Sequence, residues 1–158
     1  PELIKNGVRG AIVAVSMNDI RKAHFEKLRD MGFELINAIH PTASIAPSVT
    51  LGSGVTVAMG TIINTGVHIG NNVIINTGAI IDHECQIEDH VHISMGCSLA
   101  GRVTVKKSTL VGIGSVVREN VTIGENVIIG PCSVVLEDMP DNVVAAGTPA
   151  RIIEKRPN

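Results

Sequence analysis

The sequence from Ile45 to Pro140 repeats with a period of six residues, without insertion, over 16 consecutive hexads. The first position of every hexad (position i) is Ile, Leu or Val, and the fifth (i+4) holds only Val, Ala, Thr, Ser, Cys or Met. An amphipathic helix repeats about every 3.6 residues and a half-buried strand every second residue, so neither explains this period. A six-residue repeat is the signature of a parallel β-helix. We therefore predict about five triangular coils, stacked roughly 4.8 Å apart, with residues three hexads apart lying on top of one another.

The fourth position of the hexad (i+3) predicts a corner that needs a left-handed backbone. This position is Gly or Asn in nine hexads, and those residues tolerate positive φ most easily. Three hexads place a bulky side chain there instead, namely Glu84, His90 and Arg102. Because such residues cost backbone energy at a corner, they tend to be kept for a function.

Composition limits the partners of the chain. The formal net charge is −2, Tyr and Trp are absent and only two Phe are present. The sequence therefore offers neither a basic face nor a stacking platform for nucleic acid. No apolar run reaches membrane-spanning length and no signal peptide is visible, so we expect no membrane partner.

The three cysteines are Cys85, Cys97 and Cys132, and their spacing is not that of a metal site. Cys85 and Cys97 fall at inward i+4 positions, where Cys acts as a small apolar filler. This pattern indicates a reducing, cytoplasmic setting.

Residues 1–40 contain no hexads and predict one strand–helix–strand unit. The apolar run 11–15 is typical of a strand buried on both faces of a parallel sheet. Ser16 or Asn18 is expected to cap the following helix, and Gly32 to end it. The predicted apolar stripe of that helix consists of Ile20, Ala23, Lys27, Leu28 and Met31. A second strand over 33–39 completes a partial Rossmann-like βαβ unit, whose first strand and glycine-rich phosphate loop are absent from this sequence.

We therefore divide the chain into a partial Rossmann-like unit (1–40), a β-helix (41–140) and a C-terminal cap (141–158). In the cap, residues 143–151 predict a last partial coil. Residues 152–156 predict a short helix or strand that covers the open end, as solenoids require.

The segment Asp82-His83-Glu84 is a candidate catalytic site. His83 falls at i+2 of its hexad, so its side chain is expected to project outward from a corner, beside two carboxylates. A neighbouring carboxylate orients an imidazole and raises its basicity, as a general base requires. Gly101 follows three hexads later, directly beneath His83, and would leave a notch for an extended ligand. The alternative for the same residues is an ordinary solvated histidine above a glycine that eases a turn.

The segment 75–105, INTGAIIDHECQIEDHVHISMGCSLAGRVTV, carries a family resemblance. Together with the other hexads and the GTPAR ending, it resembles the hexapeptide acyltransferases with a left-handed parallel β-helix. It is most similar to the sugar acetyltransferases that modify sialic acid, bacillosamine or perosamine precursors. The resemblance implies transfer of acetyl from acetyl-CoA, as co-substrate and without a metal, to an amino or hydroxyl group of a nucleotide-linked or free sugar.

The resemblance also implies roles for individual residues. His83 matches the general base of the family, and Glu84 matches the acidic residue that hydrogen-bonds it. His92 matches a histidine that contacts acetyl-CoA, and Gly101 and Ile113 match backbone positions along the pantetheine arm. Pro131 stands where the family has a glycine near the far end of CoA.

Two other function classes stay open on the residues alone. The first is a zinc enzyme of the γ-class carbonic anhydrase type on the same fold, which needs three histidines, two of them five residues apart. No two histidines here have that spacing. The second is a non-catalytic β-helix that only binds or assembles.

The outward i+5 positions suggest an assembly. Steps of three hexads place Ile74, His92, Leu110 and Ile128 in one column. An apolar column of this length on a monomer would be an exposed patch. We therefore expect a homotrimer in which each acetyl-CoA lies between two neighbours.

Overall fold

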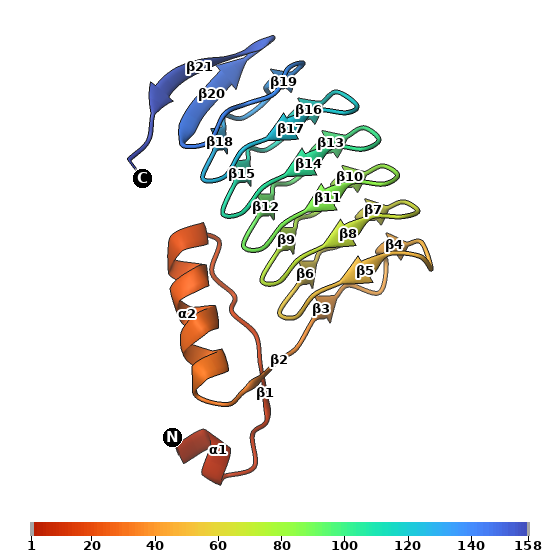
Figure 1. Cartoon of the computed structure of the whole chain (residues 1–158). Coiled ribbons are helices and arrows are strands. Elements are labelled where there is room, and N and C mark those ends of the chain that lie inside the picture. The colour runs from red at the N-terminus through yellow and green to blue at the C-terminus, as the bar shows by residue number, and fades with distance from the viewer. Residues whose placement is uncertain (1, 158) are drawn as a thin grey trace.

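The structure, a computed structural model that describes residues 2–157, is a parallel β-solenoid with a small helical unit beside it (Figure 1). The solenoid predicted from the hexads is confirmed, because residues three hexads apart pair in register, as in Ile62↔Ile80 and Ile80↔Ser98. Three sheets of six, five and eight strands form the three faces of a prism, and all of their strand pairs are parallel except the last pair of the eight-stranded sheet. The stack is longer than the predicted five coils because strands outside the hexad run join it at both ends.

Up to β19, each face takes every third strand of the chain, and β20 and β21 are then added to face 3. Face 1 contains β4 (Ser44–Ile45), β7 (Ile62–Ile63), β10 (Ile80–Ile81), β13 (Ser98–Leu99), β16 (Val116–Val117) and β19 (Val134–Val135). Face 2 contains β5 (Thr50–Leu51), β8 (His68–Ile69), β11 (Gln86–Ile87), β14 (Thr104–Val105) and β17 (Thr122–Ile123). Face 3 contains β3 (Ala38–Ile39), β6 (Thr56–Val57), β9 (Ile74–Ile75), β12 (His92–Ile93), β15 (Leu110–Val111), β18 (Ile128–Ile129), β20 (Val143–Gly147) and β21 (Ala150–Lys155).

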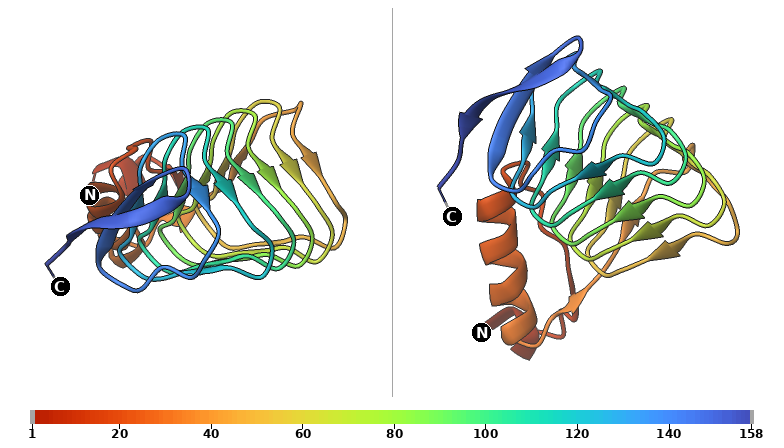
Figure 2. Two further views of the ribbon diagram at one scale, coloured as in Figure 1. Left: turned by 90° about the horizontal axis from the view of Figure 1, so that it is seen from above. Right: turned by 45° about the horizontal axis from the view of Figure 1, so that its top comes forward.

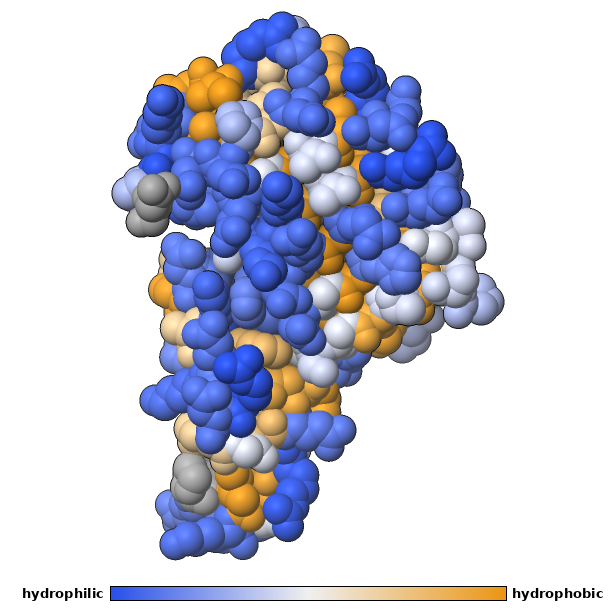
Figure 3. Space-filling model, in the orientation of Figure 1, coloured by the Kyte–Doolittle hydropathy of each residue, from blue (hydrophilic) through white to orange (hydrophobic). Residues whose placement is uncertain are grey.

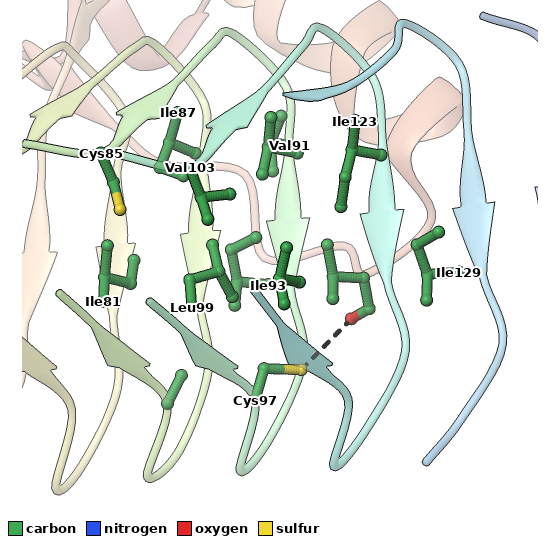
Figure 4. Packing of buried hydrophobic residues seen from close by; sticks show 14 of the residues in the cluster. Ile81, Cys85, Ile87, Val91, Ile93, Cys97, Leu99, Val103, Ile123 and Ile129 are labelled. Carbon is green, nitrogen blue, oxygen red and sulfur yellow. Dashed lines mark hydrogen bonds between the residues drawn. The ribbon is translucent and has the colours of Figure 1, made fainter. Parts of the chain in front are cut away.

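The core of the prism is built from the two inward hexad positions. Side chains at i, such as Ile81 and Leu99, and at i+4, such as Val91 and Cys97, are fully buried (Figure 4). The Cys97 thiol donates to the backbone carbonyls of Gly112 (3.1 Å) and Val111 (3.6 Å). Burial raises the pKa of Cys97, so this thiol packs as an apolar side chain.

The corners have the left-handed backbone that the i+3 position predicts. Gly and Asn adopt positive φ there, and so do the three bulky exceptions, Glu84 (φ +59°), His90 (+63°) and Arg102 (+59°). Each of these residues belongs to the turn between two strands of one coil. We call the turns from face 1 to face 2 corner 1, those from face 2 to face 3 corner 2, and those from face 3 to face 1 corner 3.

The N-terminal unit contains α1 (Glu2–Lys5), β1 (Gly10–Ala11), α2 (Asn18–Asp30) and β2 (Glu34–Leu35), with β1 and β2 paired in parallel on either side of α2 in the sequence. The prediction of one strand over 11–15 was wrong in its extent. The prediction of one strand over 33–39 was also wrong, because the chain leaves β2 and enters the solenoid as β3. Among the described strands, β1 pairs with β2 alone. Because β2 ends at Leu35, which pairs with Ala11, β1 ends at Ala11.

Helix α2 docks against the prism through a face that the sequence did not predict. Arg21 and Phe25 are its buried residues, whereas Ile20 of the predicted stripe is exposed. The predicted side-chain cap was wrong too, since Met17 is the N-cap without a side-chain hydrogen bond and Asn18 instead donates to the Ser108 carbonyl (2.9 Å). Gly32 (φ +85°) ends the helix as expected. Contact with the solenoid, rather than the hydrophobicity of the helix alone, selects the buried face.

At the opposite end of the prism, β20 extends face 3 parallel to β18, and β21 folds back antiparallel to β20 (Figure 2). The segment predicted as a partial coil followed by a short helix or strand is therefore a strand pair. Ala145 and Ala150 are buried against the last coil, whereas Ile152 and Ile153 are exposed.

Candidate active site

His83 and Glu84 lie in one turn of corner 1, between β10 and β11. The Asp82 carboxylate accepts a hydrogen bond from the His83 N–H (2.8 Å) and another from the Asn64 side chain (2.9 Å). These two bonds lower the pKa of Asp82. Asp82 therefore acts as an ionised clamp that fixes the backbone from which the imidazole projects.

The His83 ring is oriented by Glu84. Nδ1 lies 3.0 Å from Glu84 Oε2, and the two side chains are 38% and 60% exposed. The hydrogen bond to His83 comes first among the causes that lower the pKa of Glu84, followed by the charges of His83 and Arg102. An ionised Glu84 accepts from Nδ1–H and so leaves Nε2 as the unprotonated nitrogen, which is the form that a general base needs.

Gly101 lies directly against the other side of the His83 ring. A Cβ at Gly101 would overlap Nε2 and would lie 2.6 Å from Cε1, so no larger residue fits beneath the imidazole in this position. The Gly101 N–H donates no hydrogen bond within residues 2–157. This corner thus combines a partly exposed imidazole, whose Nε2 has no partner within residues 2–157, with an adjacent backbone donor, the pairing that acyl transfer requires.

His92, which is predicted to contact acetyl-CoA, lies elsewhere on the prism. Its ring on face 3 is buried, with Nδ1 3.3 Å from the Ser16 carbonyl and Nε2 3.3 Å from Asn76 Nδ2. Burial, followed by the charge of Arg21, lowers the pKa of His92. A cavity of about 410 Å³ opens beside it, between the start of α2 and face 3; its lining includes Leu110, Ile128 and Arg156.

Ile113 and Pro131 stack on neighbouring coils of corner 3, and both are exposed. A single chain therefore places the predicted site residues in two groups. His83, Glu84 and Gly101 lie at corner 1, whereas Ile113 and Pro131 lie at corner 3 with His92 on the adjoining face.

The prediction of an exposed apolar column on face 3 was wrong. Its residues do stack in register, but Ile74, Leu110 and Ile128 are only half-exposed and His92 is buried. The reason is that the N-terminal unit lies along face 3, so this column is covered within one chain (Figure 1). The exposed apolar column lies on face 1 instead, where Ile62 is 45%, Ile80 42% and Val116 45% exposed.

Corner 3 continues this exposed apolar surface, because Met59, Met95 and Ile113 stack there and are all exposed. On the side of the molecule seen in Figure 3, hydrophobic side chains lie in narrow bands between hydrophilic ones. Face 2 differs, since its outward side chains are polar: His68, Gln86, Thr104 and Thr122. We call face 1 together with corner 3 the apolar surface.

Two residues near these groups were not assigned roles from the sequence. Arg102 contacts Glu84 from the next coil, and its place at the same hexad position one coil later was a readable signal. Arg21 anchors α2 to the corner that contains His90, and no pattern in the sequence indicated this contact.

Among residues 2–157, no helix is long and apolar enough to cross a membrane. Within the same range, no three His, Cys, Asp or Glu side chains are grouped so as to hold a metal ion.

Comparisons with known proteins agree with this fold. The family model described as "Bacterial transferase hexapeptide (six repeats)" matches residues 102–137. A mutant of perosamine N-acetyltransferase from Caulobacter crescentus, in complex with CoA and GDP-perosamine, is 43% identical, with a TM-score of 0.95 over 96% of this chain and 72% of that chain. The acetyltransferase domain of PglB from Neisseria gonorrhoeae, in complex with acetyl coenzyme A, is 35% identical, with a TM-score of 0.87 over 90% of this chain and 69% of that chain.

A third similar structure is WeeI from Acinetobacter baumannii AYE. It is 23% identical, with a TM-score of 0.88 over 91% of this chain and 70% of that chain, and supports the fold alone. The Caulobacter and Neisseria acetyltransferases are 43% and 35% identical over nine-tenths or more of this chain, which is enough to show the family. The chain belongs to the hexapeptide-repeat sugar acetyltransferase family.

Proposed function

We propose that this acyltransferase moves the acetyl group of acetyl-CoA to an amino group of a nucleotide-linked sugar, with His83 as the general base. The observation that carries the proposal is the arrangement at corner 1, where a partly exposed imidazole is held by Glu84 against Gly101. The relatives support the two substrates, since one was crystallised with CoA and GDP-perosamine and another with acetyl coenzyme A. A hydroxyl acceptor would use the same base.

The proposed mechanism uses this geometry directly. His83 Nε2 removes a proton from the acceptor nitrogen as that nitrogen attacks the thioester carbonyl carbon. The Gly101 N–H donates to the carbonyl oxygen, on which negative charge develops. Breaking the C–S bond then releases CoA as the thiolate, which takes the proton back from the His83 imidazolium. Glu84 stabilises the imidazolium between these two proton transfers.

We propose that the complete site forms between two copies of a homotrimer. Corner 1 and corner 3 border opposite edges of face 1, so one chain does not bring Gly101 and Ile113 together. An exposed apolar surface of this extent suits burial against a second copy. One copy would supply His83, Glu84 and Gly101, and its neighbour Ile113, Pro131 and His92, with acetyl-CoA in the groove between them.

The finer features of the fold are part of the same proposal. We propose left-handed crossovers, an exception to the usual right-handed rule, supported by the resemblance to the acetyltransferases above. We also propose that β1–α2–β2 is part of a Rossmann-like unit (1–40) placed before the β-helix (41–140) and its cap (141–158). A cytoplasmic location is proposed from the three free cysteines.

A substrate panel tests the proposed function. The purified chain would be incubated with acetyl-CoA and GDP-perosamine, other nucleotide-linked amino sugars, or the matching hydroxyl sugars. Thiol release and the product mass would be measured. We expect a mass increase of one acetyl group on an amino sugar. Failure to acetylate any of these acceptors, with acetyl-CoA demonstrably intact, would contradict the proposal and favour a non-catalytic role.

Light scattering tests the assembly. Ile80→Glu places a charge in the middle of the apolar surface, whereas Gln86→Glu makes a comparable change on polar face 2. We expect Ile80→Glu to yield monomers without activity and Gln86→Glu to remain a trimer. A fully active monomer would rule out the shared site.

A further inference from the structure

Corner 1 carries a second unusual residue one coil beyond Glu84. Arg102 stands at the same turn position of the next coil, with φ +59°. Its Nη1 lies 3.6 Å from Glu84 Oε2, the same oxygen that lies 3.0 Å from His83 Nδ1. On its other side, Nε donates to Asn120 Oδ1 at 2.7 Å. The guanidinium is therefore held from both sides, by the coil before it and the coil after it.

Arg102 is also linked to His83 through the backbone. Its N–H donates to the His83 carbonyl (2.8 Å), and it directly follows Gly101, on which the imidazole rests. Three charged groups thus lie around the imidazole. Glu84 contacts its ring, Asp82 accepts from the His83 N–H, and Arg102 contacts Glu84 from the next coil.

Stability does not account for an arginine at this position. A long side chain costs backbone energy at positive φ, where Gly is favoured. The ion pair offers little in return, because both side chains are more than half exposed and such pairs contribute little in water. A residue that is unfavourable for the fold and contacts the partner of an exposed imidazole points to a role in the chemistry.

We propose that Arg102 is a positioning residue for acetyl transfer. Anchored by Asn120, its guanidinium holds the Glu84 carboxylate against His83 Nδ1, so that Nε2 stays directed at the acceptor. The inference rests on the proposed function, because it concerns the orientation of the proposed base. Arg102 acts through Glu84 and contacts no reacting atom.

Arg102→Gly is the main test, because Gly relieves the positive φ while removing the side chain. We expect an unchanged or slightly raised melting temperature, a kcat lowered roughly 3- to 10-fold, which is a part of what a general base contributes, and an unchanged KM for acetyl-CoA. Arg102→Asn, which also tolerates this φ, is expected to behave in the same way. Ser108→Gly relieves φ +58° at corner 2 and serves as the matched control, with unchanged kcat.

The pH profile separates positioning from a structural role. Removing a cation near His83 makes the imidazolium easier to form, so the acidic limb of kcat/KM should move to higher pH in Arg102→Gly. Arg102→Lys keeps the charge but lacks the planar fork that reaches Glu84 and Asn120 through separate nitrogens, so it should restore the limb and recover kcat only in part. In a Glu84→Gln background, Arg102→Gly should change kcat by less than twofold, since the residue through which it acts is already gone.

These outcomes distinguish this inference from the proposed function. If the parent chain acetylates no sugar, the proposed function fails. If the parent is active, the inference alone is overturned by any one of three results: wild-type kcat and pH profile in Arg102→Gly, equal losses in the Glu84→Gln and parent backgrounds, or a raised KM for acetyl-CoA at constant kcat. The last result would make Arg102 a ligand contact.

Discussion

Corner 1 and corner 2 both place a histidine in a turn with a bulky residue at positive φ, yet they use it differently. At corner 1, the His83 side chain is 38% exposed and Nε2 has no partner within residues 2–157. At corner 2, His90 is 9% exposed, stacks edge-on against Phe25 (ring centroids 5.7 Å apart) and pairs Nδ1 with Asn72 Nδ2 at 2.8 Å. Backbone strain marks both corners, but only exposure and an accessible ring nitrogen identify the one suited to chemistry.

Corner 2 is a docking point for α2. Arg21 donates to the carbonyls of His90 (2.8 Å) and Asn72 (3.1 Å), while further donors reach Val15, Ser16, Asn18 and Val91. Burial lowers the pKa of Arg21 to about 10. The guanidinium therefore remains charged at neutral pH and is compensated by carbonyl groups.

The largest expected effect concerns the two histidines directly. His83→Asn is expected to lower kcat at least about 10²-fold, because the general base is lost, with little change in melting temperature or in CoA affinity. His90→Asn, which tolerates the same positive φ, should retain most of the activity. Steady-state kinetics and calorimetric titration with CoA measure both; a His90 variant as inactive as the His83 variant would remove the distinction between the corners.

Arg21→Ala should have the largest effect on stability. It leaves several buried carbonyl groups without donors, and we expect a loss of about 2–3 kcal/mol. Urea denaturation measures the loss, and Arg29→Ala, on the exposed face of α2, is the matched control, with a change below about 0.5 kcal/mol. Equal effects of the two substitutions would contradict the docking role of Arg21.

A smaller effect is expected from pH. Burial lowers the pKa of His90 and of His92 below the ordinary value of 6.5. Each must gain a proton on unfolding at acidic pH, so the unfolded state binds more protons there and stability falls as pH drops below about 6.5. His90→Asn should flatten this dependence. Urea midpoints of the parent chain and of His90→Asn between about pH 7.5 and 5.5 test this, and identical slopes in the two proteins would contradict it.

The sequence predicted the prism because a hexad repeat fixes inward, outward and corner positions without reference to the rest of the chain. It also brought His83, Glu84 and Gly101 together, since two are adjacent and the third lies one coil beyond them. The same coil spacing would have linked Arg102 to Glu84. The direction of the Arg102 side chain at the corner is not encoded in the hexad pattern, and the ion pair with Glu84 in the structure shows it.

The sequence did not predict what covers each face. The helix stripe expected around Ile20 was wrong because Arg21 and Phe25 dock on a corner that lies far away in the sequence. Because the position of α2 was not predicted, the exposed apolar column was assigned to face 3 instead of face 1. Leu110 on face 3 lies beneath the N-terminal unit, whereas Ile80 on face 1 is exposed. Contacts between distant segments decide such features, and a local pattern does not encode them.

The most direct test of the central claim is a crystal structure of the chain with CoA and a nucleotide-linked amino sugar. The account predicts that the CoA thiol and the sugar amine meet at corner 1, with the amine within hydrogen-bond reach of His83 Nε2 and the thiol beside Gly101. A thiol placed at corner 2, or an amine that approaches no atom of His83, would contradict it.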